Sequence, residues 1–421
     1  MNTPLYRIGT GLYHTALRLG SLLGVDRARR WVDGRKQAPP LPTSITERED
    51  VPLLWMHCAS LGEWEQGRPV LEAFRSRHPG YRALLTFYSP SGYDRCRNDS
   101  AADHVAYLPA DTPDAARQWV ETLRPDLVLF VKYEFWFYHL RALHRAGVPV
   151  YLVAASFRPD QPFFKASGSW WRQLLKFFRG VVVQQPPSAD LLTGPGRYPN
   201  ARVAVGGDPR MDRMLSVAAE PFTDPLLTAF TSPARLTIVA GSVWSPDLEV
   251  LRAAWPTLPG DVRIVIAPHQ LVPDELNRIT REWSAKRYTA AQPEDLANAR
   301  VLLLDVIGIL KYAYRYGDLA YVGGGFRTGL HNTLEPLAYG RPTVFGSRHQ
   351  KFPEAGAAIA AGGAFSVSSG EELRNVLAQL LHSSERDAAA RAQRQLAANW
   401  AGGAERTVHF IEQSLALSSA S

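Results

Sequence analysis

A serine and a glutamate three positions apart are the first candidates for chemistry. They are Ser60 and Glu63 in "HCASLGEWEQGRP", residues 57–69. The Ser-x-x-Glu spacing is that of a capping box, in which the glutamate folds back onto a helix N-terminus. The pair also follows directly on an apolar run, and a carboxylate at the mouth of a cleft can have a raised pKa and act as a general base. The spacing alone leaves both interpretations open.

Two further charged residues are candidates for the same chemistry. Glu134 lies among aromatic residues in "FVKYEFWF", where a carboxylate needs a partner or a catalytic purpose. The simpler interpretation pairs it with Lys132 or with an arginine. Arg210, in "GGDPRMD", could contact a phosphate across an interdomain cleft, or it could be a solvated arginine.

A glycine-rich segment in the second half predicts a nucleotide site. The segment "YVGGGFRTGLHNTLEPLAYGRPTVFG", residues 321–346, contains Gly324 and then His331, Asn332 and Glu335. Bare backbone lets main-chain N–H groups approach phosphate oxygens, and a nearby carboxylate can accept hydrogen bonds from ribose hydroxyls. Glycines after a strand also occur for packing reasons alone.

Other predicted strand ends in this half are equally small and rich in backbone. Ligands of open parallel sheets bind beyond the carboxyl ends of the strands, so the candidates are the residues directly after each apolar run: Gly241, Ser242, Pro268, His269, Ile307 and Gly308. The chain has no GxxxxGK[ST], which removes the P-loop interpretation. It also has no Asp-x-Asp, so we expect a donor site without a metal ion or cofactor.

Alternating apolar and amphipathic segments must position these residues. Short apolar runs, each followed by a helix-like segment, predict buried parallel strands with crossover helices. In the first half they are "VPLLWMHCAS", "YRALLTFYS", "DLVLFVKY", "PVYLVAAS", "GVVVQQ" and "ARVAVGG". After a proline-containing stretch, a second series consists of "RLTIVAGSVWSPD", "VRIVIAPHQ", "ARVLLLDVIG", "LAYVGGG" and "RPTVFGS". We therefore expect an α/β fold of two doubly wound domains facing a cleft, with these boundaries: an N-terminal segment 1–40, a first domain 41–217, a linker 218–235, and a second domain 236–421 that includes the final helix.

Composition and charge exclude several classes of protein. The 421 residues are 46% hydrophobic and 21% charged, which is globular composition and not that of a disordered chain. The two cysteines have no metal-site spacing, so a reducing compartment is the default. The net charge of +7 favours an acidic partner. Nucleic acid is disfavoured because basic residues are not interleaved with aromatics outside the N-terminal segment.

The N-terminal segment has the pattern of a helix that lies on a membrane. At helical spacing one arc is apolar and the opposite side carries Arg7, His14 and Arg18; the apolar residues are Leu5, Ile8, Leu12, Ala16, Leu19 and Leu23. Behind the helix, residues 26–37 contain five basic and two acidic residues and also Trp31. The alternative is a helix docked on the protein's own core with a solvated basic face. No stretch of 18 apolar residues exists, so a spanning helix is not expected.

Taken in order, the marker segments resemble one known family. "WMHCASLGEWEQGRPVL", "VKYEFW", "VGGDPRMD", "APHQ" and the segment at 321–346 are similar to those of the 3-deoxy-D-manno-octulosonic acid (Kdo) transferases of lipid A biosynthesis. The resemblance implies a GT-B glycosyltransferase fold, a CMP-Kdo donor and a lipid A precursor as acceptor. It also implies attachment to the anionic cytoplasmic face of the inner membrane. The first domain would then bind the acceptor and the second the nucleotide sugar.

The resemblance also assigns roles by position. Glu63 matches the catalytic base, Glu134 a second required acid, and Arg210 stands where the family usually has lysine. The matched CMP contacts are Pro268, His269, Ile307, Gly308, Ile309, Asn332, Thr333, Leu334 and Glu335. Three departures redistribute the donor's polar contacts: His269 replaces the usual arginine, Ile309 replaces a usual acid, and "GLHN" replaces "GGHN".

Two other functions fit parts of the pattern. One is a GT-B transferase or an epimerase that uses another nucleotide sugar, which would be protected from thermal unfolding by a different nucleotide. The other is a non-catalytic basic membrane-binding protein, whose affinity would follow salt concentration and would not depend on Glu63.

Overall fold

Two compact units make up the chain. The computed structural model describes residues 3–48, 50–327 and 329–419. Unit 1 is Met1–Asp212 together with Gly402–Ser421, and unit 2 is Arg213–Ala401. These bounds differ from the sequence prediction, which placed a linker at 218–235 and assigned the final helix to the second domain.

Unit 1 is built around a parallel seven-stranded sheet in the order β3-β2-β1-β4-β5-β6-β7. Its strands are β1 (Leu53–Cys58), β2 (Arg82–Phe87), β3 (His104–Tyr107), β4 (Leu127–Val131), β5 (Val150–Ala155), β6 (Gly180–Val183) and β7 (Val203–Val205). Every residue of β1, β4 and β5 is buried, as expected for strands covered on both faces. In register, Leu54 of β1 lies opposite Leu127 of β4.

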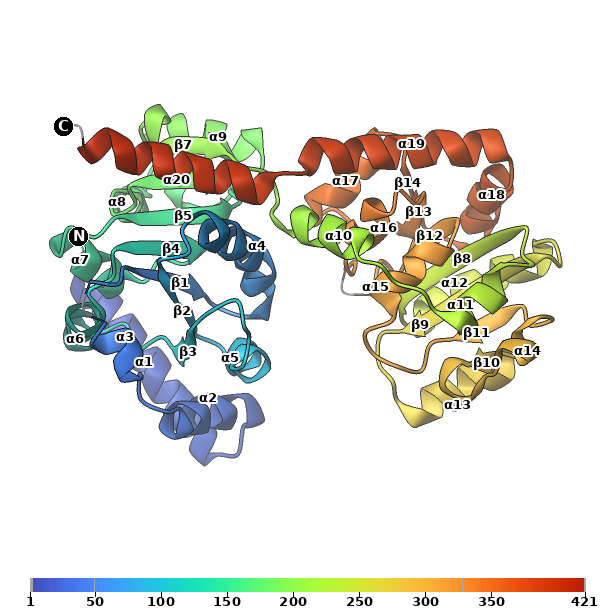
Figure 1. Cartoon of the computed structure of the whole chain (residues 1–421), viewed down its shortest axis with the longest axis horizontal. Helices are drawn as coiled ribbons and strands as arrows, with labels where there is room; N and C mark the ends of the chain where they lie inside the picture. The colour runs from blue at the N-terminus through green and yellow to red at the C-terminus, as the bar shows by residue number, and fades with distance from the viewer. Residues whose placement is uncertain (1–2, 49, 328, 420–421) are drawn as a thin grey trace. The chain divides into compact units, whose positions relative to one another are not determined.

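Helices cover both faces of this sheet (Figure 1). They are α1 (Thr3–Leu22), α2 (Asp26–Gln37), α3 (Thr43–Thr46), α4 (Leu61–Arg77), α5 (Pro90–Cys96), α6 (Pro113–Leu123), α7 (Phe137–Arg145), α8 (Ser169–Leu175), α9 (Pro186–Thr193) and α20 (Gly403–Ser419), while α10 (Arg210–Ala219) contains the boundary between the units. Short 3₁₀ turns lie at Pro162–Phe164 and Asn200–Arg202. The final helix α20 belongs here because Val408 and Ile411 are fully buried in the unit 1 core.

Unit 2 repeats the architecture with its own parallel seven-stranded sheet, in the order β10-β11-β9-β8-β12-β13-β14. Its strands are β8 (Leu236–Val243), β9 (Val262–Pro268), β10 (Lys286–Arg287), β11 (Val301–Leu303), β12 (Leu319–Val322), β13 (Thr343–Gly346) and β14 (Ala364–Val367). Its helices are α11 (Pro225–Thr231), α12 (Ser245–Ala254), α13 (Pro273–Glu282), α14 (Pro293–Leu296), α15 (Leu310–Ala313), α16 (Leu334–Ala338), α17 (Pro353–Ala360), α18 (Gly370–Leu380) and α19 (Ser383–Trp400), with 3₁₀ turns at Trp255–Thr257, Tyr288–Ala290 and Tyr314–Tyr316.

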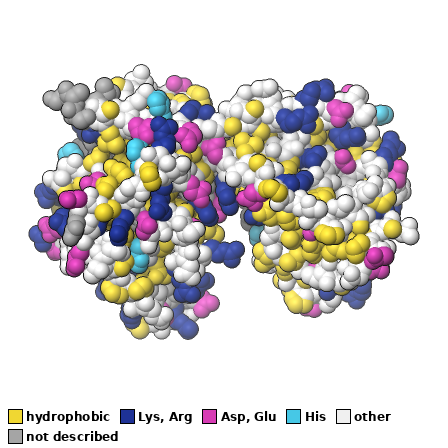
Figure 2. All heavy atoms as spheres, in the orientation of Figure 1, with side chains coloured by type: hydrophobic (Ala, Val, Ile, Leu, Met, Phe, Trp, Pro, Cys, Tyr) yellow, Lys and Arg dark blue, Asp and Glu magenta, His cyan; other side chains and the backbone are white. Residues whose placement is uncertain are grey.

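Each sheet has one point where the chain reverses its direction of winding. The reversal falls between β1 and β4 in unit 1 and between β8 and β12 in unit 2. Ligands of doubly wound sheets bind at the carboxyl ends of the strands that flank such a point. On the face shown in Figure 2, no large patch of one charge sign indicates a further ligand site. Lys and Arg side chains are interspersed there with Asp and Glu on both units.

The apolar arc of α1 faces away from the body of unit 1. Leu12 is 66% exposed and Leu19 is 55% exposed, whereas the other side of the helix makes the contacts. The Tyr6 hydroxyl donates to Asp111 Oδ2 at 2.6 Å, and the His14 ring stacks on Trp31 at 5.7 Å. The helix is therefore docked on unit 1 by Tyr6 and His14, and its apolar arc is left exposed.

Trp31 packs on unit 1. Its indole lies 5.7 Å from the Tyr88 ring, and the Arg35 guanidinium stands 3.8 Å above the indole ring and donates to Tyr88 O at 2.7 Å. Burial lowers the pKa of Arg35 to about 10. Aromatic partners on the protein therefore hold both side chains. No helix in the described residues is long and apolar enough to cross a membrane.

Candidate active site

Glu63 lies in the first turn of α4, directly beyond the carboxyl end of β1. The side chain of Ser60, the N-cap, accepts from Gly62 N–H at 3.3 Å and donates its own hydroxyl to the Glu63 carboxylate. In a capping box the glutamate would instead accept from the Ser60 backbone N–H. Among the hydrogen bonds of the described residues, Glu63 accepts only the serine hydroxyl. Its half-buried carboxylate is thus not used by the helix backbone.

Glu134 follows β4 on the other side of the same switch point. It is 8% exposed, and its Oε2 lies 3.2 Å from His57 Nε2 and accepts from the indole N–H of Trp136. His57, fully buried at the end of β1, contacts Thr86 Oγ1 at 2.9 Å through Nδ1. Glu134 therefore contacts a histidine and a tryptophan, neither of which was among the partners that the sequence suggested. The same indole N–H lies 3.0 Å from His57 Nε2, so Glu134, His57 and Trp136 form one hydrogen-bonded cluster.

Arg210 begins α10, near the end of the first part of unit 1. Its guanidinium pairs with Asp208, with Nη2 at 2.6 Å from Oδ2 and Nε at 3.0 Å from the same oxygen. The Asp208 carboxylate also accepts from the Arg210 backbone N–H at 3.0 Å. The arginine is therefore held in a fixed orientation rather than being freely solvated.

Five of the residues predicted for the second site line one small cavity of unit 2. It measures about 210 Å³, and its predicted members are Ser242, Gly308, His331, Asn332 and Glu335. Asn332 donates to Glu335 Oε1 at 3.2 Å and accepts from Leu334 N–H at 3.1 Å, which orients both polar side chains at the start of α16. Lys311 and Tyr314 also line the cavity. The sequence analysis missed both because they lie inside a helical segment and not at a strand end.

A stack of rings stands beside this cavity. Trp244 stacks on His269 at 4.3 Å, and His269 stacks on His331 at 4.2 Å. The indole N–H of Trp244 donates to His331 Nε2 at 2.8 Å, and the Arg327 guanidinium lies 4.1 Å from the Trp244 ring on the stack. Burial, followed by the charge of His269, lowers the pKa of His331 to about 4. Burial and Arg327 also lower the pKa of His269, so both rings are neutral near pH 7.

The glycines at 323–325 are explained first by packing. A Cβ on Gly323 would lie 2.3 Å from Ser242 O, and one on Gly325 would lie 2.6 Å from the Gly346 backbone. Gly324 has φ of 93° and donates to the buried Asp247 at 2.9 Å. Asp247 also accepts from Trp244 N–H at 2.9 Å and from the Tyr321 hydroxyl at 3.1 Å. The glycines thus let three strand ends approach closely, and one buried carboxylate holds the loop.

The other predicted residues of unit 2 lie near these elements without lining the cavity. Gly241 packs against the Tyr314 hydroxyl, where a Cβ would lie at 2.1 Å, and Pro268 ends β9. Thr333 and Leu334 are buried at the start of α16, and the Thr333 hydroxyl has no partner among the described residues. Ile309 is the N-cap of α15, whereas Ile307 is 80% exposed. Ser242, with φ of 53°, is a non-glycine residue in a left-handed conformation beside the cavity, a kind of outlier that often marks functional sites.

Two doubly wound parallel units, each with polar groups at its switch point, define the GT-B class of glycosyltransferases and related epimerases. Solved structures agree at the level of the fold. A glycosyltransferase from Rickettsia africae matches with a TM-score of 0.57 and 11% identity, covering 87% of this chain and 99% of that one. The UDP-GlcNAc 2-epimerase from Neisseria meningitidis matches with a TM-score of 0.58 and 16% identity, covering 86% and 99%.

Sequence comparisons narrow the class to one family. Residues 30–213 match the family model described as 3-deoxy-D-manno-octulosonic-acid transferase (kdotransferase). The 3-deoxy-D-manno-octulosonic acid transferase of Bordetella pertussis is 27% identical over 96% of this chain and 99% of its own. That of Aquifex aeolicus is 26% identical over 78% and 86%. The chain belongs to the Kdo transferase family and is a glycosyltransferase.

Proposed function

We propose that this enzyme transfers Kdo from CMP-Kdo to a lipid A precursor of the lipid IVA type, with inversion at the anomeric carbon. The observation that carries the proposal is the state of Glu63. Its carboxylate lies at the carboxyl end of β1 and accepts a serine hydroxyl instead of capping its helix. A carboxylate held in this way remains available to accept a proton.

In the proposed reaction Glu63 takes the proton of the acceptor's primary hydroxyl. The oxygen of that hydroxyl then forms a bond to the anomeric carbon of Kdo as the bond from that carbon to the phosphate of CMP breaks, and CMP leaves with the bonding electrons. Glu134, fixed by His57 and Trp136, would order the acceptor side of the site. Arg210, fixed by Asp208, would stabilise charge that develops on the leaving phosphate.

The cavity of unit 2 is the proposed place for CMP. Glu335 would accept from the ribose hydroxyls, and Lys311 supplies positive charge for the phosphate at the same cavity. The neutral ring of His269 replaces the fixed charge of the arginine that is usual in the family, so we expect Lys311 to carry more of the phosphate contact here than elsewhere in the family. No step of this scheme requires a metal ion.

Attachment to the anionic cytoplasmic face of the inner membrane is proposed through α1. Its exposed apolar arc would lie in the lipid interface while Tyr6 and His14 hold the helix to unit 1. The exposed arginines of α2 lie next to it in the chain and would contact anionic headgroups.

Incubation with CMP-Kdo generated in situ and a tetraacylated lipid A precursor, followed by mass analysis of the lipid, tests the proposal. We expect a mass increase of one or more Kdo residues together with release of CMP. An unmodified lipid in the presence of folded enzyme would contradict it.

The other candidate is a transferase or epimerase for a different nucleotide sugar, which the shared fold with UDP-GlcNAc 2-epimerases keeps under consideration. Thermal protection separates the two, because a ligand that binds only the native state raises the melting temperature with its concentration. Protection by CMP or CTP but not by UDP or GDP favours Kdo transfer, and the reverse favours the other sugar.

A further inference from the structure

A strongly cationic cavity lies in unit 1, away from the two strand switch points. It measures about 570 Å³ and is formed by α8 on one side and by the loop between α9 and β7 on the other. Four cationic side chains line it and, among its described lining residues, there is no carboxylate: Arg172, Lys176, Arg197 and Arg202. No ion pair involving these four occurs in the described part of the chain, so their charge is uncompensated by protein.

The walls of this cavity are preformed. The Tyr198 hydroxyl donates to Phe178 O at 2.7 Å, which ties the loop to the segment after α8. The loop is closed by Gly196 N–H donating to Leu191 O at 2.8 Å and by Tyr198 N–H donating to Leu192 O at 2.9 Å. On the other wall, Arg172 donates to Phe163 O at 2.9 Å. A ligand would therefore find the cations already gathered.

Backbone strain occurs at the same place. Arg197 has φ of 55°, in the left-handed region that a non-glycine side chain rarely adopts. Such outliers cost free energy and persist where the surrounding structure fixes them, often next to a ligand. Here the strain presents an arginine on the rim of a cavity that already holds three other cations.

We propose that this cavity, the α8 cavity, is a binding site for a phosphomonoester. Four cations without a carboxylate match a dianionic phosphate better than a singly charged phosphodiester, and arginine forms paired hydrogen bonds with phosphate oxygens. Two sources share this chemistry, a lipid headgroup and a free phosphate. The lipid headgroup is favoured because α8 lies against α1, the helix proposed to contact the membrane. Trp170 of α8 packs on Tyr6 of α1 at 5.8 Å, and Trp171 of α8 is exposed. The proposal does not depend on the proposed reaction.

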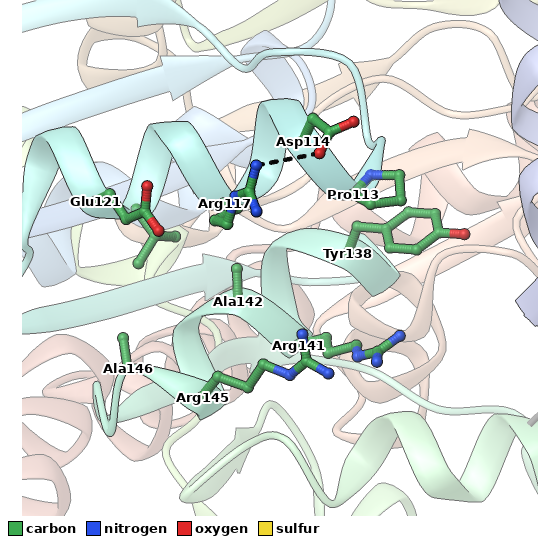
Figure 3. Close-up of a pocket in the computed structure, with 10 residues that line it drawn as sticks. Pro113, Asp114, Arg117, Glu121, Tyr138, Arg141, Ala142, Arg145 and Ala146 are labelled. Carbon is green, nitrogen blue, oxygen red and sulfur yellow. Dashed lines mark hydrogen bonds and ion pairs between the residues drawn. The ribbon is translucent and has the colours of Figure 1, made fainter.

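A second cavity of unit 1 provides a matched control. It lies between α6 and α7, measures about 400 Å³, and also contains arginines, Arg117, Arg141 and Arg145 (Figure 3). Its lining includes the carboxylates of Asp114 and Glu121, and Asp114 pairs with Arg117 at 3.3 Å. Figure 3 shows Arg141 and Arg145 extending from the same helix, α7. Removing two arginines here changes the net charge of the protein as much as removing two from the α8 cavity.

The test compares Arg197→Gln/Arg202→Gln with Arg141→Gln/Arg145→Gln in the full chain. Each protein is titrated with inorganic phosphate in a thermal-shift assay. Each is also sedimented with phosphatidylcholine vesicles that contain phosphatidic acid or, at equal surface charge, phosphatidylglycerol. Both double variants must melt near the parent, which is expected because Arg197, Arg202 and Arg145 are exposed and Arg141 is partly so.

We expect the parent to prefer phosphatidic acid, and the Arg197/Arg202 variant to bind those vesicles about tenfold more weakly while the control pair changes less than threefold. A phosphate-dependent thermal shift lost only in the Arg197/Arg202 variant would show that free phosphate suffices. A preference for phosphatidic acid without that shift would show that the site needs a lipid. Equal losses in both double variants, or no response of the parent to either probe, would overturn the proposal. Kdo transfer is not measured, so a failure here is separate from a failure of the proposed reaction.

Discussion

At the scale of single residues, a glutamate in the first turn of a helix can serve the helix or the reaction. Glutamine has the same length and still accepts hydrogen bonds, but it cannot take a proton. We expect Glu63→Gln to melt within a few degrees of the parent, to keep its thermal protection by CMP, and to transfer Kdo at least about a hundredfold more slowly, the usual cost of losing a general base.

Glu65→Gln is the matched control for this variant, because Glu65 is exposed on the same helix. It should transfer Kdo at the parental rate. If folded Glu63→Gln turned over within a factor of three of the parent, Glu63 would not be the base and Glu134 would become the candidate.

The imidazole of His331 gives a prediction about pH. Its pKa in the folded protein is about 4, below the ordinary value of 6.5, because burial and His269 disfavour its charged form. Between these two values the unfolded chain binds a proton that the native state does not. The contribution of His331 to stability is therefore complete above pH 6.5 and is lost as the pH falls toward 4.

Titration of isotope-labelled histidine by NMR measures this directly. The His331 signal should stay constant from pH 8 to about 5.5 and should move only at lower pH. In Trp244→Phe the indole N–H that donates to His331 Nε2 is absent, so the midpoint should rise. A midpoint above pH 6 in the parent would contradict the buried, neutral ring.

Single-residue roles that arise from distant contacts could not be predicted from the sequence. Glu63, Glu134 and Glu335 could be selected because each lies near the end of a recognisable strand or helix. His57 and Asp247 could not, since their partners are 77 and 74 positions away at Glu134 and Tyr321. The glycine run was predicted from backbone freedom, but which backbone approaches it depends on the packing of β8 and β13.

At the scale of elements, the length and hydrophobicity of each strand decided whether it could be predicted from the sequence. Eleven apolar runs predicted as strands are strands in the structure, from β1 to β13. The strands that the sequence analysis missed are β3, β10 and β14, and all three are edge strands. Strand β10 has two residues, Lys286 and Arg287, and β14 has an exposed serine in "AFSV", so neither has the continuous apolar run of a central strand.

The orientation of α1 is an element-scale feature with a direct test. Leu12 and Leu19 are exposed, so Leu12→Ser/Leu19→Ser should leave the melting temperature and the CMP-dependent shift unchanged. Burying a leucine is worth about 1.5–3 kcal/mol, so binding to phosphatidylcholine vesicles containing phosphatidylglycerol should weaken at least about tenfold. Val272→Ser, an exposed apolar position on unit 2, is the control and should bind like the parent. Unchanged binding of the double variant would place the membrane contact on another surface.

At the scale of the whole molecule, unit 1 is built from two separate segments of the chain. Unit 2 is one continuous segment, whereas unit 1 needs residues from both ends of the chain. The sequence analysis assigned the last helix to the second domain, which directly precedes it in the chain. The side chains of α20 follow a different pattern of burial, since Val408 and Ile411 are buried with Met56 and Val153 in the unit 1 core. The ion pair of Glu412 with Arg77 at 2.6 Å adds a polar contact to α4.

This arrangement predicts that damage to the last helix will destabilise unit 1. Ile411 is fully buried, and removing its side chain as Ile411→Ala should cost about 2–5 kcal/mol. Hydrogen exchange of the full chain, followed by mass spectrometry, should therefore quicken in peptides from β6 and α4, which α20 contacts, and should stay at the parental rate in peptides from 213–401. Leu377→Ala on α18, a buried leucine of the unit 2 core, should give the opposite pattern. Faster exchange in unit 2 of Ile411→Ala would mean that the two units unfold as one body and that α20 stabilises both.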